Sequence, residues 1–338
     1  MTTHNRLRQL MVRVAHLERQ AALVDGLQGR DLSGRDLKGM NFSNANLKGT
    51  NLQGADLERA NLEGAHLEGA NLYGAHLEGA HLEGANLWGA NLEGAILMGA
   101  NLYRASLKGA NLTGANLDGA NLDGANLELA NLTSATLEGA ILNNAILLSA
   151  NLEKAHIAKA LLVEADISEA LFQEASLREA NLTKAKSFSA NFNEADLKDA
   201  ILKEARLDGA VFSAALLVGA DLTGAHADSA YFDAANLRSA NLLSVTMIDT
   251  SFAGANLEGA DLSNSILSHS TFRGAFLTSA ILTYCNLHHS NLSDSNLKGA
   301  DLMGANLSEA DLSDALYSSR TRLPSSITPS QLQSMIKV

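Results

Sequence analysis

The chain repeats one pattern of polar and apolar positions every five residues from Gly26 to Ala315. Each unit opens with a polar residue, usually Asn or Asp, continues with a large apolar residue and two outward positions, and closes with a small residue. Residues 71–80, for example, read Asn-Leu-Tyr-Gly-Ala and then His-Leu-Glu-Gly-Ala. An α-helix repeats its apolar residues about every 3.6 positions and a β-strand about every two, so a fixed period of five fits neither. The pattern instead predicts a solenoid in which short extended segments alternate with corners, and in which the apolar centre and the small residue point inward.

A ladder of phenylalanines predicts the length of one turn. Six of them occupy the central position at intervals of 20 residues, an agreement that chance would give roughly once in a thousand. Four units per turn would stack all six rings in one column. Asparagines keep the same 20-residue register from Asn51 to Asn151, and their amides are expected to hydrogen-bond along the stack. The ladder comprises Phe172, Phe192, Phe212, Phe232, Phe252 and Phe272.

These units closely resemble the pentapeptide repeat family, whose motif is written A(D/N)LXX, over about 290 of the 338 residues. The resemblance implies an all-β solenoid, specifically a right-handed quadrilateral β-helix. The 58 units centred on Leu27 to Leu312 correspond to about 14 coils. At a strand spacing of ~4.8 Å, such a rod would be ~70 Å long.

The frame divides the chain into residues 1–25, 26–315 and 316–338, and the two flanking segments are predicted to contain helices. Residues 1–25 carry a stripe of leucines, valines and alanines beside several arginines, which predicts an amphipathic helix that caps the first coil. Charged residues interrupt the apolar run of this segment, unlike a secretory signal, so a cytoplasmic protein without a membrane span is expected. Binding of this basic helix to a membrane surface is the alternative.

The C-terminal segment has its own helix signal. Pro324 is expected to end the stacking, because proline lacks an N–H donor. Thr328, Pro329 and Gln331 match an N-cap, a first helical residue and a capping-box glutamine. The predicted helix runs from Pro329 to Val338, and it either covers the last coil or joins two molecules into a homodimer. Its expected apolar side consists of Leu332, Met335 and Ile336.

Charge limits the choice of partner. The chain has a net charge of −12, and residues 51–140 contain three Lys or Arg against eleven Asp or Glu. A rod of this charge would repel phosphate, so direct nucleic-acid binding is not expected and a basic protein surface is the favoured partner. Trp88 stands near these acids, 20 residues before Lys108, so a local cation–π contact competes with a role in partner binding. The candidate interaction surface comprises Glu58, Glu63, Glu78, Glu83 and Trp88.

The search for an active site used columns, because stacking places residues 20 apart side by side. Asp249, His269, His289 and Glu309 form one outward column, with His288 beside it. Imidazoles one coil apart can share a metal ion between flanking carboxylates, but a solvated polar column is the favoured interpretation, and no metal site is predicted. No nucleophile has an evident base and orienting group, so the chain is predicted not to be an enzyme and to need no cofactor. The isolated His66, His76 and His81 are interpreted as replacements for Asn.

Two functions remain open, and both are binding functions. The favoured one is a scaffold or regulator that binds a protein partner, whose identity the sequence does not give. The alternative comes from the resemblance, since quinolone-resistance members of the family are acidic dimeric rods that mimic DNA on gyrase. The unbroken frame departs from those members, because it lacks the projecting loops that many of them use on gyrase.

Overall fold

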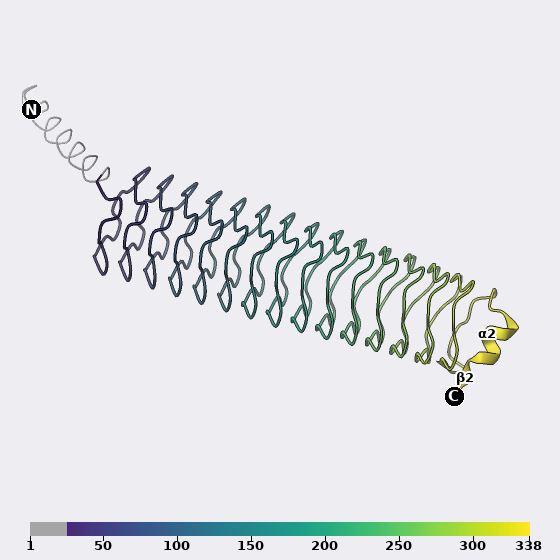
Figure 1. Ribbon diagram of the computed structural model, residues 1–338. Coiled ribbons are helices and arrows are strands. Elements are labelled where there is room, and N and C mark those ends of the chain that lie inside the picture. The colour runs from purple at the N-terminus through teal and green to yellow at the C-terminus, as the bar shows by residue number, and fades with distance from the viewer. Residues whose placement is uncertain (1–25) are drawn as a thin grey trace, which may run out of the picture.

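The computed structural model describes residues 26–338, which form a rod of stacked coils with residue 26 at one end and the C-terminus at the other (Figure 1). The chain winds continuously along the rod. A chain of this kind has no central globular core, because each coil packs only on the coils before and after it.

Parallel backbone pairing joins residues 20 positions apart. Asn71, for example, bridges both Asn51 and Asn91. The N–H of Leu72 donates to the carbonyl of Asn91 at 2.6 Å, and the N–H of Asn71 donates to the carbonyl of Thr50 at 3.0 Å. Backbone groups of each coil are therefore bonded in both directions along the rod. One turn holds four five-residue units, which confirms the register that the phenylalanine ladder predicted.

The fourth residue of each unit turns the corner in a left-handed backbone conformation. Gly74 has a φ of 58°, which glycine adopts at little cost. Between Gly139 and Gly209 the sequence has no glycine, yet Glu164 keeps a φ of 58°. For a residue with a side chain, the left-handed conformation costs ~1–2 kcal/mol relative to the right-handed one. The N–H of Glu164 donates to the carbonyl of Thr183 at 3.0 Å, so bonding between coils holds the corner.

Two side chains per unit fill the interior. The central leucines and the closing alanines are buried along nearly the whole rod. Rings of the six ladder phenylalanines are fully buried and stack with centroids 4.7 to 5.1 Å apart and interplanar angles of 3 to 11°. This spacing is the coil spacing, so the rings extend the backbone stack into the interior.

The asparagine ladder forms over part of its predicted length. From Asn71 to Asn111 each side-chain amide donates to the asparagine one coil earlier, at 3.1 to 3.2 Å. At Asn131 the amide turns to the hydroxyl of Thr113 instead, at 2.9 Å. A threonine two residues after an asparagine therefore supplies an alternative acceptor within hydrogen-bond reach.

In the C-terminal third, hydroxyl residues replace several inward alanines. The Ser265 hydroxyl donates to the carbonyl of Leu242 at 2.8 Å and accepts from the N–H of Val245 at 3.1 Å. The buried Cys285 thiol occupies the same kind of position and contacts the carbonyl of Leu262 at 2.9 Å. Burial raises the pKa of this thiol to about 12, so Cys285 is a packed, unreactive side chain.

The C-terminal segment folds back on the last coil. The two-residue strand β1, Leu316–Tyr317, pairs in parallel with β2, Ile336–Lys337, and the helix α2 between them covers Pro329–Ser334. Thr328 caps α2, and the predicted capping box with Gln331 is present. The prediction that the helix continues to Val338 was wrong, because the chain becomes extended at Met335 and pairs as β2.

Because the chain leaves the helix at Met335, the three apolar residues predicted to share one side of the helix do not lie together. Met335 is buried against the end of the rod, whereas Leu332 and Ile336 stay 40% and 45% exposed. The side chain of Gln331 donates to the carbonyls of Leu307 and Ala310, at 2.7 and 3.2 Å. The segment therefore satisfies backbone acceptors at the rod's end while leaving two apolar side chains outside.

The predicted capping helix of residues 1–25 lies outside the described residues. Over residues 26–338, no helix combines the length and the hydrophobicity that a bilayer crossing requires.

Candidate functional site

The functional side chains project from the two outward positions of each unit. Because a coil has four units, it has four sides, and residues 20 apart lie on the same side. Glu58 and Glu78 share one side, and Glu63 and Glu83 share the next. Trp88 lies on the third side, opposite Glu78. The structure thus brings the acids together in two neighbouring columns, but it does not place all five candidate residues on one face.

Local contacts engage part of this acidic segment. Glu58 forms an ion pair with Lys38 one coil earlier. Glu78 faces the imidazole Nδ1 of His76 at 3.4 Å. In each case the side chain of the acid is only about a quarter to a third exposed, with values of 27% and 30%. These two carboxylates are consequently less free to meet a partner than the sequence alone indicates.

The second acidic column is more open. Glu83 faces the Nδ1 of His81 at 3.3 Å and accepts from the side-chain amide of Asn101 at 2.6 Å. Glu63, by contrast, is exposed, and its backbone N–H donates to Asn61 at 3.0 Å. The column therefore presents one exposed and one partly engaged carboxylate on the side next to Trp88.

Histidines in this segment do more than replace asparagine. An asparagine at the opening position accepts from the backbone N–H two residues later, as Asn71 does from Tyr73 at 3.2 Å. His66 instead faces the carboxylate of Glu68, at 3.5 Å. Burial opposes ionisation of Glu68, but its own backbone N–H and the Lys48 ammonium group outweigh that effect, so the net pKa is lowered. The recurring His-Leu-Glu spacing was the sequence signal for these pairs, and the sequence analysis missed it.

Trp88 is the most exposed aromatic side chain of the acidic segment, at 59%. Lys108, one coil later, is paired with Glu128 at 2.8 Å. Tyr73 and Tyr103 are exposed as well, 15 residues before and after Trp88, and hence on the two adjacent sides in successive coils. The three aromatics make a diagonal line around the rod, and Tyr103 lies in the column of Glu63 and Glu83.

The histidine column near the C-terminus is compact. The rings of His269 and His289 stack with centroids 5.0 Å apart, and the ring of His288 lies 4.0 Å from that of His289. The Nε2 atom of His289 is 3.3 Å from a carboxylate oxygen of Glu309. Ligand atoms of His288, His289 and Glu309 all lie within 4.8 Å of one another. Asp249, at the far end of the predicted column, is not part of this trio.

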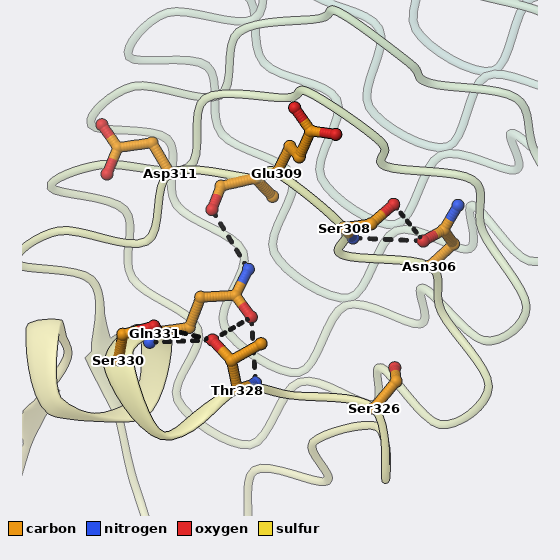
Figure 2. A pocket seen from close by; sticks show the side chains of 9 residues that line it. Asn306, Ser308, Glu309, Asp311, Ser326, Thr328, Ser330 and Gln331 are labelled. Carbon is orange, nitrogen blue, oxygen red and sulfur yellow. Dashed lines mark hydrogen bonds between the residues drawn. The ribbon is translucent and has the colours of Figure 1, made fainter.

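An open polar groove of about 480 Å³ lies between the last coils and the C-terminal segment (Figure 2). Its walls include Glu309 and Asp311 from the coils and Thr328 and Gln331 from the segment around α2. Figure 2 shows the Gln331 side chain reaching from the helix toward the coil backbone. No sequence signal predicts this groove, because the groove depends on how the C-terminal segment folds back.

Comparison with known proteins identifies the repeat. A family model described as "Pentapeptide repeats (8 copies)" matches the chain repeatedly between residues 27 and 316. No curated protein matches the chain. The matched segments are residues 27–64, 60–99, 75–114, 95–133, 110–147, 130–166, 150–186, 190–226, 215–252, 247–283 and 280–316.

Several solved structures are similar. One is HetL, a pentapeptide repeat protein involved in heterocyst differentiation regulation in the cyanobacterium Nostoc sp. strain PCC 7120. HetL is 35% identical to this chain, and the match covers 64% of this chain and 88% of HetL with a TM-score of 0.42. A pentapeptide repeat protein of the cyanobacterium Cyanothece 51142 is 31% identical over 30% of this chain and 63% of its own, with a TM-score of 0.19. QnrB1, a plasmid-mediated fluoroquinolone resistance protein, is 16% identical over 66% of this chain and 91% of its own, with a TM-score of 0.24.

Proposed function

The chain belongs to the pentapeptide repeat family, and from that premise we propose that it is a non-enzymatic scaffold or regulator that binds a protein partner along the sides of the rod. Proteins of this family are generally structural or interaction proteins. The proposal includes the finer features expected from the sequence, namely a right-handed rod of about 14 coils, ~70 Å long, located in the cytoplasm. A rod of that length offers several separate docking positions.

The exposure of Trp88 is the observation that carries this proposal. Tryptophan and tyrosine are enriched among the residues that contribute most to protein–protein binding. Trp88 has Glu83 on the neighbouring side of the same coil and Glu63 one coil earlier. We therefore place the docking surface along the edge between the side of Glu63 and Glu83 and the side of Trp88. The chemistry of this edge suits a partner that offers basic residues around an apolar pocket.

A homodimer through the C-terminal segment is a further part of the proposal. Leu332 and Ile336 are exposed at the end of the rod, while Met335 is already packed against the last coil. The same segment can thus cover its own rod and still present apolar side chains to a second molecule.

Partner capture with matched variants tests the docking edge. The Trp88→Ala variant is expected to bind a captured partner at least about 30-fold more weakly than the wild type, because truncation of a central aromatic anchor costs about 2 kcal/mol or more. Tyr284→Ala is the control, since Tyr284 is also an exposed aromatic residue, at 69%, but lies far along the rod. Affinities are measured by titration calorimetry with the purified partner. Equal affinities of the wild type and Trp88→Ala would place the contact elsewhere.

The alternative function is DNA mimicry on gyrase, which the net charge of −12 favours. Under this alternative, micromolar protein changes the supercoiling activity of gyrase, and reversal of Glu58, Glu63, Glu78 and Glu83 to Lys weakens that effect. Glu58 is paired with Lys38 and the Glu78 side chain is only 30% exposed, so fewer free carboxylates face a partner than the net charge indicates, and we expect gyrase activity to be unchanged. If the protein changes supercoiling and the four reversals abolish that change, the protein is a DNA mimic on gyrase and the scaffold proposal is wrong.

A further inference from the structure

Coil stacking and one local turn bring three metal-ligating side chains to the same corner of the rod. His289 and Glu309 are 20 residues apart and hence in one column, and His288 adjoins His289 in the chain. His289 and Glu309 sit in left-handed corner positions, with φ values of 56° and 58°. Corner residues project from the rod, so both side chains are exposed, and His288 is half-buried beside them.

Hydrogen bonds around His288 determine which of its nitrogens is free. The Ser308 hydroxyl donates its only proton to the side-chain oxygen of Asn306, at 2.7 Å. Toward His288 Nδ1, 2.8 Å away, the Ser308 oxygen can then only accept. The backbone carbonyl of Ser308, 3.1 Å from the same nitrogen, is also an acceptor. Nδ1 must therefore carry the proton.

This assignment leaves the Nε2 atom of neutral His288 with a free lone pair. A protonated Nδ1 that donates to a backbone carbonyl is the usual arrangement of a metal-binding histidine, because the second hydrogen bond fixes the tautomer and the ring orientation. The ring of His288 is thus held by the coil of Ser308, and its Nε2 atom keeps a lone pair for a ligand. None of the other histidines within residues 26–338 has this combination of a fixed tautomer and a second histidine alongside.

Spacing within the trio fits a small metal ion. A tetrahedral Zn²⁺ ion with bonds of ~2.1 Å separates its ligand atoms by ~3.4 Å. His289 Nε2 and the Glu309 oxygen are already 3.3 Å apart. All three ligand atoms lie within 4.8 Å, so closure around an ion needs shifts of roughly an ångström, which the exposed side chains of His289 and Glu309 can supply.

We propose that His288, His289 and Glu309 bind a divalent transition-metal ion, with Zn²⁺ as its representative, near the C-terminal end of the rod. Two imidazoles and one carboxylate favour zinc, nickel or copper over calcium or magnesium, which prefer sites made of oxygen ligands. Solvent completes the coordination, because a site with three protein ligands keeps an open position. This inference is independent of the proposed docking edge at Trp88, which lies on other coils.

The proposed trio differs from the column that the sequence predicted. His269 stacks on His289 at 5.0 Å with an interplanar angle of 22°, so it supports the ring of a ligand rather than belonging to the trio. His288 was regarded only as a neighbour of the column, yet its ring lies closest to His289. The orientation of His288 changes the favoured interpretation from a solvated column to a binding site.

Zinc titration of the full-length protein, after removal of any histidine tag, tests the proposal. Titration calorimetry and competition with a chromophoric chelator are expected to show one tight equivalent of Zn²⁺. His288→Ala and His289→Ala are each expected to weaken this binding at least about 10-fold, since even loss of a group that only orients a ligand has an effect of this size. His226→Ala is the matched control, because His226 is an exposed histidine in another column.

A second variant and a second readout separate loss of the site from loss of the fold. Glu309→Gln keeps the shape of the side chain and removes its charge, and it should weaken Zn²⁺ binding while the melting temperature without metal stays that of the wild type. Co²⁺ in place of Zn²⁺ should give absorption bands of a four- or five-coordinate ion in the wild type and lose them in His288→Ala. Equal Zn²⁺ affinity of the wild type and of both alanine variants would overturn the proposal, as would the absence of any tight equivalent in the wild type.

Discussion

Insertion of one residue after Ala235 is expected to lower the stability of the rod by at least about 3 kcal/mol, whereas insertion of a whole coil at the same point should leave it nearly unchanged. Asn236 bridges Leu216 on one side and Asn256 on the other. A single extra residue either shifts every later pair by one position, which turns inward side chains outward, or bulges from a corner. Both outcomes remove several coil-to-coil hydrogen bonds, each contributing about 1 kcal/mol.

The matched control is a duplication of residues 216–235, which inserts 20 residues. This segment is one complete coil of the protein and carries Phe232, so it preserves both the backbone register and the aromatic stack. Melting temperatures from circular dichroism of the two variants provide the comparison. Similar melting temperatures would show that the 20-residue turn does not control stability.

Much of the fold could be predicted from the sequence because the same physical requirement recurs in every unit. The spacing of Phe172 and its successors gave the turn length, and stacking at 4.7 to 5.1 Å follows directly once residues 20 apart are neighbours. Lys48 and Glu68, which form an ion pair at 3.2 Å, are also 20 residues apart, so the same spacing predicts that they are neighbours. In a solenoid with a known turn length, the separation of two residues in the sequence therefore predicts whether they lie side by side.

Features that depend on side-chain torsion or on the tail were not predictable in this way. Column spacing placed His289 and Glu309 together, but the ring direction of His288 depends on hydrogen bonds to Ser308 that no periodicity specifies. The C-terminal helix stopped at Ser334, because pairing of β2 with β1 competes with helix extension. Helical propensity over a few residues is weaker than such a tertiary contact.

The interior stack provides the second large expected effect. Phe212→Ala should destabilise the protein by about 3–5 kcal/mol, because it leaves a cavity in a fully buried position that rigid coils on both sides cannot close. Phe276→Ala is the control, since its side chain is 54% exposed and its loss should change stability by no more than about 0.5 kcal/mol. Chemical denaturation measures both, and hydrogen exchange should show the loss of protection concentrated in the coils next to Phe212.

Comparison of a middle with an end phenylalanine of the ladder separates the contribution of ring stacking to stability from that of burial. Phe212 has a ring on each side, at 4.7 Å, whereas Phe172 stacks on Phe192 alone, at 4.8 Å. Both side chains are fully buried, so the burial contributions are equal. Each aromatic pair adds about 0.5–1.5 kcal/mol beyond burial, and Phe212→Ala should therefore cost about 1 kcal/mol more than Phe172→Ala. Equal costs would mean that the ladder stabilises the rod only by filling its interior, and that the parallel rings are a consequence of the coil register.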